Sequence, residues 1–291
     1  MNNAVTQLSL DSWACDNPDT DIPQALETGK VLFFPQLAFA LHDTEYALLT
    51  PALLGPKTRN ISFASAGLSG AVGSDGTLLM LEAMMQRFRR HAQHLIQSLL
   101  PRYTASVALG ATSFRPMDVS ERRQSWRADD RRLHVDAFPS RPNNGERILR
   151  VFTNINPAGE PRVWRVGEPF EQVARQFLPN LRPYTAWQAR LLKRLGITKS
   201  LRSEYDHLML QLHDNMKRDA AYQDTAPQVT VPFPAGSTWV CFSDQVPHAS
   251  MAGQYLLEQT LHLPARKLYQ PDTSPLAVLR ALTGRPLTVE Q

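Results

Sequence analysis

The chain has 291 residues, of which 43% are hydrophobic and 20% are charged. This apolar content is enough for a buried core and excludes an intrinsically disordered chain. Two cysteines exclude a disulfide scaffold, and a net charge of +4 is too small for a basic nucleic-acid-binding arm, so we expect no nucleic acid partner. No segment approaches the about 18 apolar residues of a membrane span, and the N-terminus lacks the pattern of a cleaved secretory signal.

The first third of the chain is expected to be mainly helical. Val31–Phe34 is a short apolar run ended by a proline and predicts a strand, whereas the Gly- and Ser-rich stretch Ser62–Gly76 predicts a loop. Leu78–Leu100 has the clearest helical period, and its apolar residues are Leu81, Met84, Phe88, Leu95 and Leu99. We interpret this stripe as core, with contact to a membrane surface as the alternative, because arginines lie beside it.

Beyond residue 105, strands and helices alternate in blocks. The predicted strands are 107–109, 113–115, 133–138, 148–156, 162–166, 228–233, 237–242 and 254–263. The predicted helices are 170–177, 184–195, 204–222 and 274–283. Strand blocks that must pair across a helical insert predict an α+β fold with a double-stranded β-helix (jelly-roll or cupin-like) core. We expect one domain over 1–291, with N-terminal helical support in 1–105, jelly-roll strands in 106–166 and 228–263, and the insert in 167–227.

A His-x-Asp pair stands in one of the predicted strands. His134 and Asp136 are two residues apart, so in a strand their side chains point to the same face. His248 follows a second predicted strand and a short polar loop, far beyond Asp136 in the chain. Two histidines and one carboxylate form the facial triad that leaves coordination positions open on non-haem Fe(II). We therefore predict that His134, Asp136 and His248 bind Fe(II) and form the catalytic centre.

Zinc is the alternative metal, since a His₂Asp set also serves zinc hydrolysis. The strand and loop context of the three residues and the absence of a His-Glu-x-x-His helix favour iron. An iron oxygenase of this type uses 2-oxoglutarate and O₂ as cosubstrates, and a basic side chain is needed to hold the distal carboxylate of 2-oxoglutarate.

The residue that binds this carboxylate is not obvious. The strand after His248 has no Arg or Lys, and Gln259 stands where an arginine is expected. Arg147 and Arg150, on the strand that follows the His-x-Asp pair, are the alternatives. We favour Arg150, with Asn154 on the same face, because an arginine in an apolar strand needs an anionic partner. A salt bridge to Glu146 or Glu258 would also satisfy Arg150, and His262 could contact the cosubstrate or simply pack in the core.

Longer stretches of the chain resemble a known family, the Kdo hydroxylases, which are Fe(II)/2-oxoglutarate-dependent dioxygenases of Gram-negative bacteria. The matching segments are VLFFP, RLHVDAFPSRPNNGERILRVFTNINP, LMLQLHDNMKRD and FPAGSTWVCFSDQVPHASMAGQYLLEQTLHL. The resemblance implies hydroxylation at C3 of 3-deoxy-D-manno-oct-2-ulosonic acid (Kdo) attached to lipid A. The product would be D-glycero-D-talo-oct-2-ulosonic acid, with succinate and CO₂ released. It also implies that His134, Asp136 and His248 are the metal ligands.

A substrate of this kind is anionic and lipid-linked. The run SERRQSWRADDRR directly precedes the metal strand, and its Arg127, Arg131 and Arg132 are candidate contacts for carboxylate and phosphate, although nearby acidic residues nearly balance the run. We expect the protein in the cytoplasm, in peripheral contact with the cytoplasmic face of the inner membrane.

Three alternatives remain open at the level of the sequence. The first is a 2-oxoglutarate oxygenase of the same fold that acts on a protein or a small metabolite, because fold does not determine substrate. The second is a non-catalytic jelly-roll module that binds a sugar or a lipid. The third is the zinc hydrolase.

Overall fold

The computed structural model describes residues 4–16, 18–121 and 124–288. Its β-strands are β1 (Val5–Gln7), β2 (Val31–Phe34), β3 (Ile61–Ala64), β4 (Gly67–Ser69), β5 (Ala108–Arg115), β6 (Glu146–Asn154), β7 (Arg162–Gly167), β8 (Gln228–Phe233), β9 (Thr238–Phe242), β10 (His248–Ala252) and β11 (Leu256–Pro264). Its α-helices are α1 (Ile22–Glu27), α2 (Asp75–Leu99), α3 (Phe170–Phe177), α4 (Ala186–Arg194), α5 (Glu204–Arg218), α6 (Ala220–Thr225) and α7 (Pro275–Thr283). Among the described residues, no helix has both the length and the apolar content to cross a bilayer.

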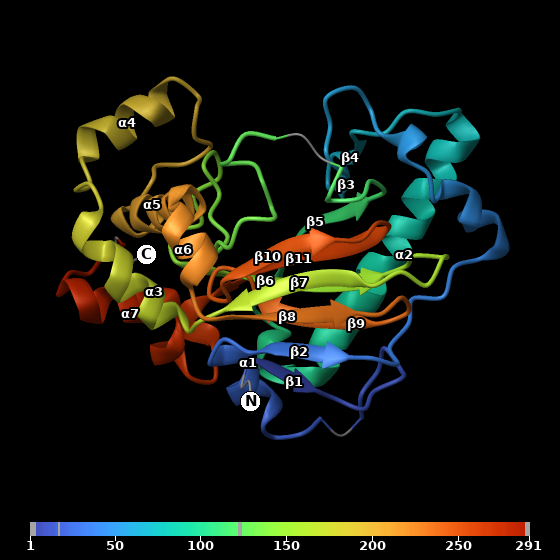
Figure 1. The fold of residues 1–291 in the computed structure, drawn as a ribbon, viewed down its shortest axis with the longest axis horizontal. Helices are drawn as coiled ribbons and strands as arrows, with labels where there is room; N and C mark the ends of the chain where they lie inside the picture. The colour runs from blue at the N-terminus through green and yellow to red at the C-terminus, as the bar shows by residue number, and fades with distance from the viewer. Residues whose placement is uncertain (1–3, 17, 122–123, 289–291) are drawn as a thin grey trace.

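The strands form two sheets (Figure 1), with the orders β1-β2-β9-β6-β11-β5-β3-β4 and β10-β7-β8. The chain passes repeatedly from one sheet to the other: β5 and β6 belong to the large sheet, β7 and β8 to the small one, β9 to the large one, β10 to the small one and β11 to the large one. Neighbours within this core pair antiparallel. This alternation is the double-stranded β-helix, so the predicted jelly-roll fold class is confirmed.

Aromatic side chains fill the space between the two sheets. Phe152 and Trp239 come from the large sheet, and Trp164 and Phe233 come from the small one. The ring of Phe233 stacks on Trp239 at 4.1 Å, and the ring of Trp164 meets Trp239 edge-on at 5.5 Å. Such ring pairs add stabilisation beyond the area that they bury. The cluster makes one end of the barrel a dry, rigid wall.

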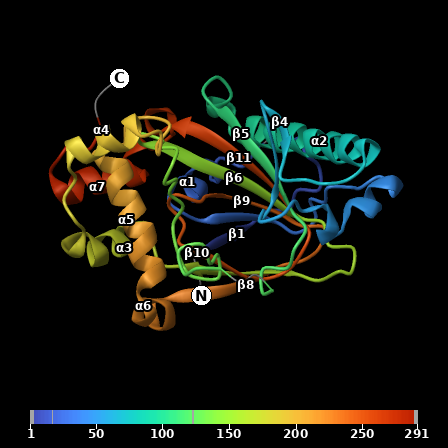
Figure 2. The same ribbon diagram turned by 90° about the horizontal axis from the view of Figure 1, so that it is seen from above.

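Helix α2 covers the outer face of the large sheet (Figure 2). It begins at Asp75, where the Ser74 hydroxyl accepts a hydrogen bond from the Thr77 amide as an N-cap. Its predicted apolar stripe is buried in the main core, and the members are Leu81, Met84, Phe88, Leu95 and Leu99. The interpretation of this stripe as core is therefore confirmed, and it is not available to a membrane.

Helices of the insert, together with the C-terminal helix α7, support the segment that carries the His-x-Asp pair. Helices α3, α5, α6 and α7 bury a second apolar cluster that also contains Leu133, Val135 and Ala249. Leu133 and Val135 flank His134, so the backbone around His134 is anchored in this apolar cluster. The predicted helix 204–222 is divided into α5 and α6 at Asp219, whose backbone is extended. The Asp219 side chain caps α6 by accepting a hydrogen bond from the Tyr222 amide.

Three predictions about local structure were wrong. The N-terminal region 1–105 is not only helical support, because β1 to β4 extend both edges of the large sheet. The expected loop 62–76 contains most of the β3–β4 hairpin, and the expected strand 133–138 makes only a single bridge, at His134. Strand β10 was not predicted. Such short segments show too little periodicity to be recognised, and their pairing is decided by distant strands.

Candidate metal centre

Backbone hydrogen bonds bring the His134–Asp136 segment next to His248. His134 and His248 form an antiparallel bridge, in which the His134 amide donates to the His248 carbonyl at 3.0 Å and the His248 amide donates back at 2.8 Å. The Asp136 amide donates to the carbonyl of Ser243 at 2.8 Å, so the second residue of the motif is held as well. The bridge explains how ligands that lie far apart in the sequence become neighbours.

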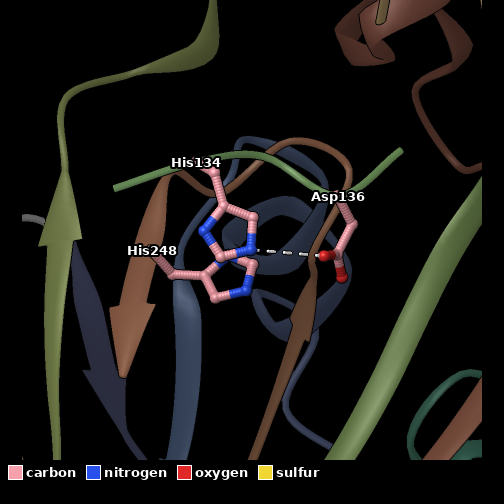
Figure 3. A group of neighbouring side chains, drawn as sticks. All are labelled: His134, Asp136 and His248. Carbon is pink, nitrogen blue, oxygen red and sulfur yellow. Dashed lines mark ion pairs between the residues drawn. The ribbon is translucent and has the colours of Figure 1, made fainter. Parts of the chain in front are cut away.

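The three side chains converge on one point (Figure 3). His134, Asp136 and His248 each offer a ligand atom, and these atoms lie within 4.8 Å of one another. The Nε2 of His134 is 3.6 Å from Oδ1 of Asp136. The Nδ1 atoms of the two imidazoles are hydrogen-bonded at 2.8 Å, to the Arg132 carbonyl and the Val246 carbonyl respectively. Each Nδ1 therefore carries the proton, and each Nε2 keeps the lone pair that binds a metal.

The environment keeps all three groups in their metal-binding forms. Burial, together with the nearby Lys217 ammonium, lowers the pKa of His134 to about 3, and burial also lowers the pKa of His248. Burial by itself would raise the pKa of Asp136, but the Arg150 guanidinium and the His134 ring outweigh it and hold this pKa well below its usual range. Two neutral imidazoles and one carboxylate result, which is the set that a divalent metal ion requires.

Aromatic and imidazole rings surround the ligands. The ring of Trp164 stacks on His248 with a centroid separation of 4.9 Å and an interplanar angle of 21°. The ring of His213, on α5, meets the His134 ring edge-on at 5.3 Å, and His213 Nδ1 lies 3.0 Å from Oδ1 of Asp214. These contacts restrict both ligand rings to one orientation, as a preformed metal site requires.

A chain of buried charges continues from the ligands into the large sheet. Arg150 Nη2 lies 3.0 Å from Oδ2 of Asp136, and Arg150 Nη1 pairs with Glu258. Glu258 also pairs with Arg115 of β5 at 2.8 Å. Arg150 is 9% exposed. Two guanidiniums therefore share two carboxylates, and one of these, Asp136, is a predicted metal ligand.

A cavity of about 630 Å³ opens over the three ligands. Its volume is in the range of small-molecule sites. Basic side chains are prominent on its walls, and these are Arg59, Arg115, Arg127, Arg150, Arg162 and Lys217. Its acidic residues are Asp130, Asp136, Asp214 and Glu258, and its apolar wall includes Phe138, Phe152, Trp164 and Leu256. The lining suits an anionic ligand whose reacting part lies in a dry, apolar environment.

Comparisons with known proteins agree with this geometry. The family model of 3-deoxy-D-manno-oct-2-ulosonic acid (Kdo) hydroxylase matches residues 11–286. The chain belongs to the Kdo hydroxylase family. No curated protein sequence matches it significantly. The family, and the fold class expected from the resemblance, are confirmed.

This family member is similar over its whole length to solved structures of the Kdo hydroxylase KdoO, described as a non-heme Fe(II) α-ketoglutarate-dependent dioxygenase. The complex with cobalt(II) is 45% identical and has a TM-score of 0.94, covering 99% of this chain and 98% of that one. The complex with α-ketoglutarate and Fe(III) is 45% identical with a TM-score of 0.92, covering 98% and 97%. The complex with succinate and Fe(III) is 45% identical with a TM-score of 0.93, covering 99% and 98%.

In this Kdo hydroxylase family member, two of the predicted cosubstrate residues lie on the wrong face of the large sheet. Arg147 is fully buried on the α2 side of β6, where it pairs with Asp244 at 2.8 Å. Gln259 lies on the same side of β11 and hydrogen-bonds the Thr112 hydroxyl. Neither residue lines the cavity described above. We correct both predictions: residues at odd and even positions of a strand point to opposite faces, and Arg150 and Glu258 occupy the inner one.

Of the other three predicted cosubstrate residues, Arg150 lines the cavity, whereas Asn154 and His262 do not. Arg150 forms a salt bridge with Glu258, which is one of the two acidic partners, Glu146 and Glu258, that the sequence suggested. The Asn154 side chain donates to the carbonyls of Glu160 and Phe233 at the end of β6, so it holds the chain rather than facing the cavity, and we correct this prediction too. His262 lies outside the cavity lining, 6.1 Å from the ring of Phe138, which does line it.

Of the predicted substrate-binding arginines, only Arg127 lines the cavity. It is largely exposed, and its Nε lies 3.1 Å from Oδ2 of Asp214. Arg131 pairs with the nearby Asp129 at 2.9 Å, and Arg132 donates to the Lys217 carbonyl at 2.8 Å. Neither arginine lines the cavity, so their contact with substrate stays a prediction. Arg122 and Arg123 of the same run lie outside the described residues.

Two cavity residues, Arg162 and Trp164, were not predicted. Both point into the barrel from β7 and line the cavity. Arg162 Nη1 donates to the carbonyl of Gly253 at 2.6 Å. Gly253 has φ +109°, and a Cβ there would lie 2.9 Å from the Arg162 backbone, so the loop after β10 can approach only with glycine. The alternation in PRVWRVG could have identified the pair, since Arg162, Trp164 and Val166 share one face.

Proposed function

We propose that this chain is an Fe(II)- and 2-oxoglutarate-dependent dioxygenase that hydroxylates C3 of Kdo on Kdo-lipid A. One molecule of O₂ supplies one oxygen atom to the C3 hydroxyl group and one to succinate, and 2-oxoglutarate loses CO₂. The product sugar is D-glycero-D-talo-oct-2-ulosonic acid. The observation that carries the proposal is the convergence of His134, Asp136 and His248 at a cavity with many basic side chains.

The residues of the site fit Fe(II). Both histidines present an Nε2 lone pair and Asp136 is a carboxylate, so the donor set is the facial triad of non-haem iron. When bound, the iron supplies the activation of O₂ and the redox chemistry that converts the C3–H bond into C–OH. The protein supplies the geometry. The backbone bridge between His134 and His248 holds together the two segments that carry the three donors, and all three residues line the cavity, where cosubstrate and substrate can bind.

We propose Arg150 as the main contact for a carboxylate of 2-oxoglutarate. Its guanidinium lies beside the metal ligand Asp136 and lines the cavity, so it can hold an anion that also reaches the metal. Arg115 and Arg162 are two further guanidiniums on the same walls. The apolar wall of Phe152 and Trp164 excludes water from the reacting carbon.

The outer part of the cavity fits the rest of the substrate. Kdo carries a carboxylate and lipid A carries phosphates, and Arg59, Arg127 and Lys217 are further basic residues that line the cavity. Because this substrate is held in a membrane, we propose that the protein works in peripheral contact with the cytoplasmic face of the inner membrane.

The test is succinate release by the iron-loaded protein with purified Kdo-lipid A, together with mass spectrometry of the lipid. We expect one added oxygen atom, located on Kdo, and no succinate above background with peptides. Substrate-dependent succinate release with other metabolites but not with Kdo would support the first alternative. Absence of a 2-oxoglutarate charge-transfer band on anaerobic addition of Fe(II) would support a binding module instead.

A further inference from the structure

The segment from α4 to the start of α5 exposes an unusual amount of apolar surface. Of the eight large apolar side chains that are exposed in the described part of the chain, five belong to this segment: Trp187, Leu191, Leu195, Ile197 and Leu201. Trp187 and Leu195 are 63% and 62% exposed. Scattered exposed apolar residues are ordinary in a folded protein, but a group of five in one short segment indicates a contact surface.

The arrangement on α4 is that of an interfacial helix. Trp187, Leu191 and Leu195 follow one another at intervals of four, which places them along one face of the helix. Arg190 and Arg194 fall beside this stripe, and all five side chains are exposed. Ala189 is buried and attaches the opposite face to the protein. The apolar ridge therefore points outward, with basic side chains along its edge.

The charge of the surrounding segment is one-sided. Between Gln172 and Ser203 the sequence has no Asp or Glu but has seven basic residues, namely Arg175, Arg182, Arg190, Lys193, Arg194, Lys199 and Arg202. Without these seven, the remaining 24 basic residues would be outnumbered by the 27 acidic ones. Five of the seven lie in 185–202, the segment that also exposes the apolar ridge, and without these five alone the remaining 26 basic residues would be outnumbered by the 27 acidic ones. Apolar side chains edged by cations match a membrane surface that contains anionic lipid.

The segment is joined directly to the rim of the cavity. The Lys199 amide donates to the Ser140 carbonyl at 2.9 Å, and Arg202 Nη2 donates to the Pro139 carbonyl at 2.7 Å. Pro139 lines the cavity and closely follows the metal ligand Asp136 in the chain. Figure 1 shows α4 at the outer edge of the molecule. A surface bound through α4 would therefore have the cavity rim close to it.

We infer that the segment 185–202 docks the protein on an anionic lipid bilayer, with Trp187, Leu191 and Leu195 entering the interface. This inference rests on the proposed function, since it explains how a lipid-linked sugar reaches the cavity. Aromatic and leucine side chains enter the boundary between headgroups and acyl chains, while the arginines stay with the phosphates. The site of docking differs from the one considered from the sequence, because the stripe of α2 is core.

The test is co-sedimentation with vesicles of phosphatidylethanolamine and phosphatidylglycerol, with phosphatidylcholine vesicles for comparison. We expect the wild-type protein to bind the anionic vesicles. The W187S/L191S/L195S and R190Q/K193Q/R194Q variants should each bind at least about tenfold more weakly. The matched control is Leu79→Ser, which removes an apolar side chain of 68% exposure from α2 and should bind like wild type. Trp187 fluorescence should shift to shorter wavelength when wild-type protein meets the anionic vesicles.

Two further measurements separate this inference from the proposed function. Succinate release with a lipid-free Kdo saccharide should be unchanged by W187S/L191S/L195S, whereas hydroxylation of Kdo-lipid A in vesicles should fall with vesicle binding. Wild-type binding to vesicles without hydroxylation of any Kdo substrate would refute the function but not the docking surface. Equal vesicle binding by wild type and the triple variant would refute the docking surface. The docking surface would also be refuted if the triple variant changed only the oligomeric state, because the exposed apolar side chains of segment 185–202 would then join two copies of the chain.

Discussion

Arg147 and Arg150 lie three residues apart on β6 and serve different purposes, which can be separated by replacing each with leucine. Arg147 is fully buried between Asp244 and the ring of Phe242, whose centroid is 3.8 Å from the guanidinium carbon. Arg150 lines the cavity beside Asp136. We expect Arg147→Leu to lower stability and Arg150→Leu to weaken the binding of 2-oxoglutarate.

The magnitudes follow from what each substitution leaves behind. Arg147→Leu leaves Asp244, which is 1% exposed, without its guanidinium, and removing one partner of a buried ion pair costs about 3–5 kcal/mol. In a domain of this size that corresponds to a melting temperature lower by roughly 10 °C. Arg150→Leu removes charge-assisted hydrogen bonds to a carboxylate, which are worth about 1.5–3 kcal/mol each, so the half-saturating 2-oxoglutarate concentration should rise about 100-fold. In the Arg150→Leu variant, Glu258 still has its ion pair with Arg115 at 2.8 Å. This variant should therefore lose less stability than Arg147→Leu.

The assays are thermal unfolding by circular dichroism and succinate release at varied 2-oxoglutarate and fixed sugar concentration. The double variant Arg147→Leu/Asp244→Leu is the control for stability, and it should recover part of the loss because no unpaired charge stays buried. If Arg147→Leu raised the 2-oxoglutarate requirement while Arg150→Leu did not, the assignment of faces on β6 would be refuted.

Three other outcomes are expected. Replacing His134 or Asp136 with Ala should abolish turnover and reduce the affinity for cobalt(II), with a circular dichroism spectrum close to wild type; retained turnover would exclude the triad. The metal-free protein should lose stability as pH falls from about 6.5 toward 3, because unfolded His134 takes up its proton near pH 6.5 and the folded residue only at about 3; the urea midpoint of a His134→Gln variant should depend less on pH in this range. Gln259→Ala should lower stability by about 1–3 kcal/mol, because Thr112 loses its buried acceptor, yet leave the 2-oxoglutarate requirement within about twofold; a large rise would place Gln259 at the cosubstrate after all.

Much of the metal centre was predictable because it depends on short-range rules. The strand period places His134 and Asp136 on one face, and a second histidine in strand and loop context completes a set of known coordination chemistry. Long runs around these residues allowed the family to be recognised. The helices 78–100 and 170–177 were predictable for the same reason, since an apolar stripe or short helix is encoded by consecutive residues.

The partners of the charged residues were not predictable in this way. Whether Arg147 or Arg150 faces the three predicted metal ligands depends on the register of β6 against β9 and β11, two strands that lie far away in the sequence. Alternation places Arg162 and Trp164 on one face of β7, but only the position of β7 opposite the large sheet shows that this face lines the cavity. At the edges of the large sheet, β1 pairs with β2, β3 pairs with β5, and β4 pairs with β3. Local sequence encodes which way successive side chains alternate. It does not encode which distant strand lies beside them, because that choice depends on the free energy of the whole packed barrel.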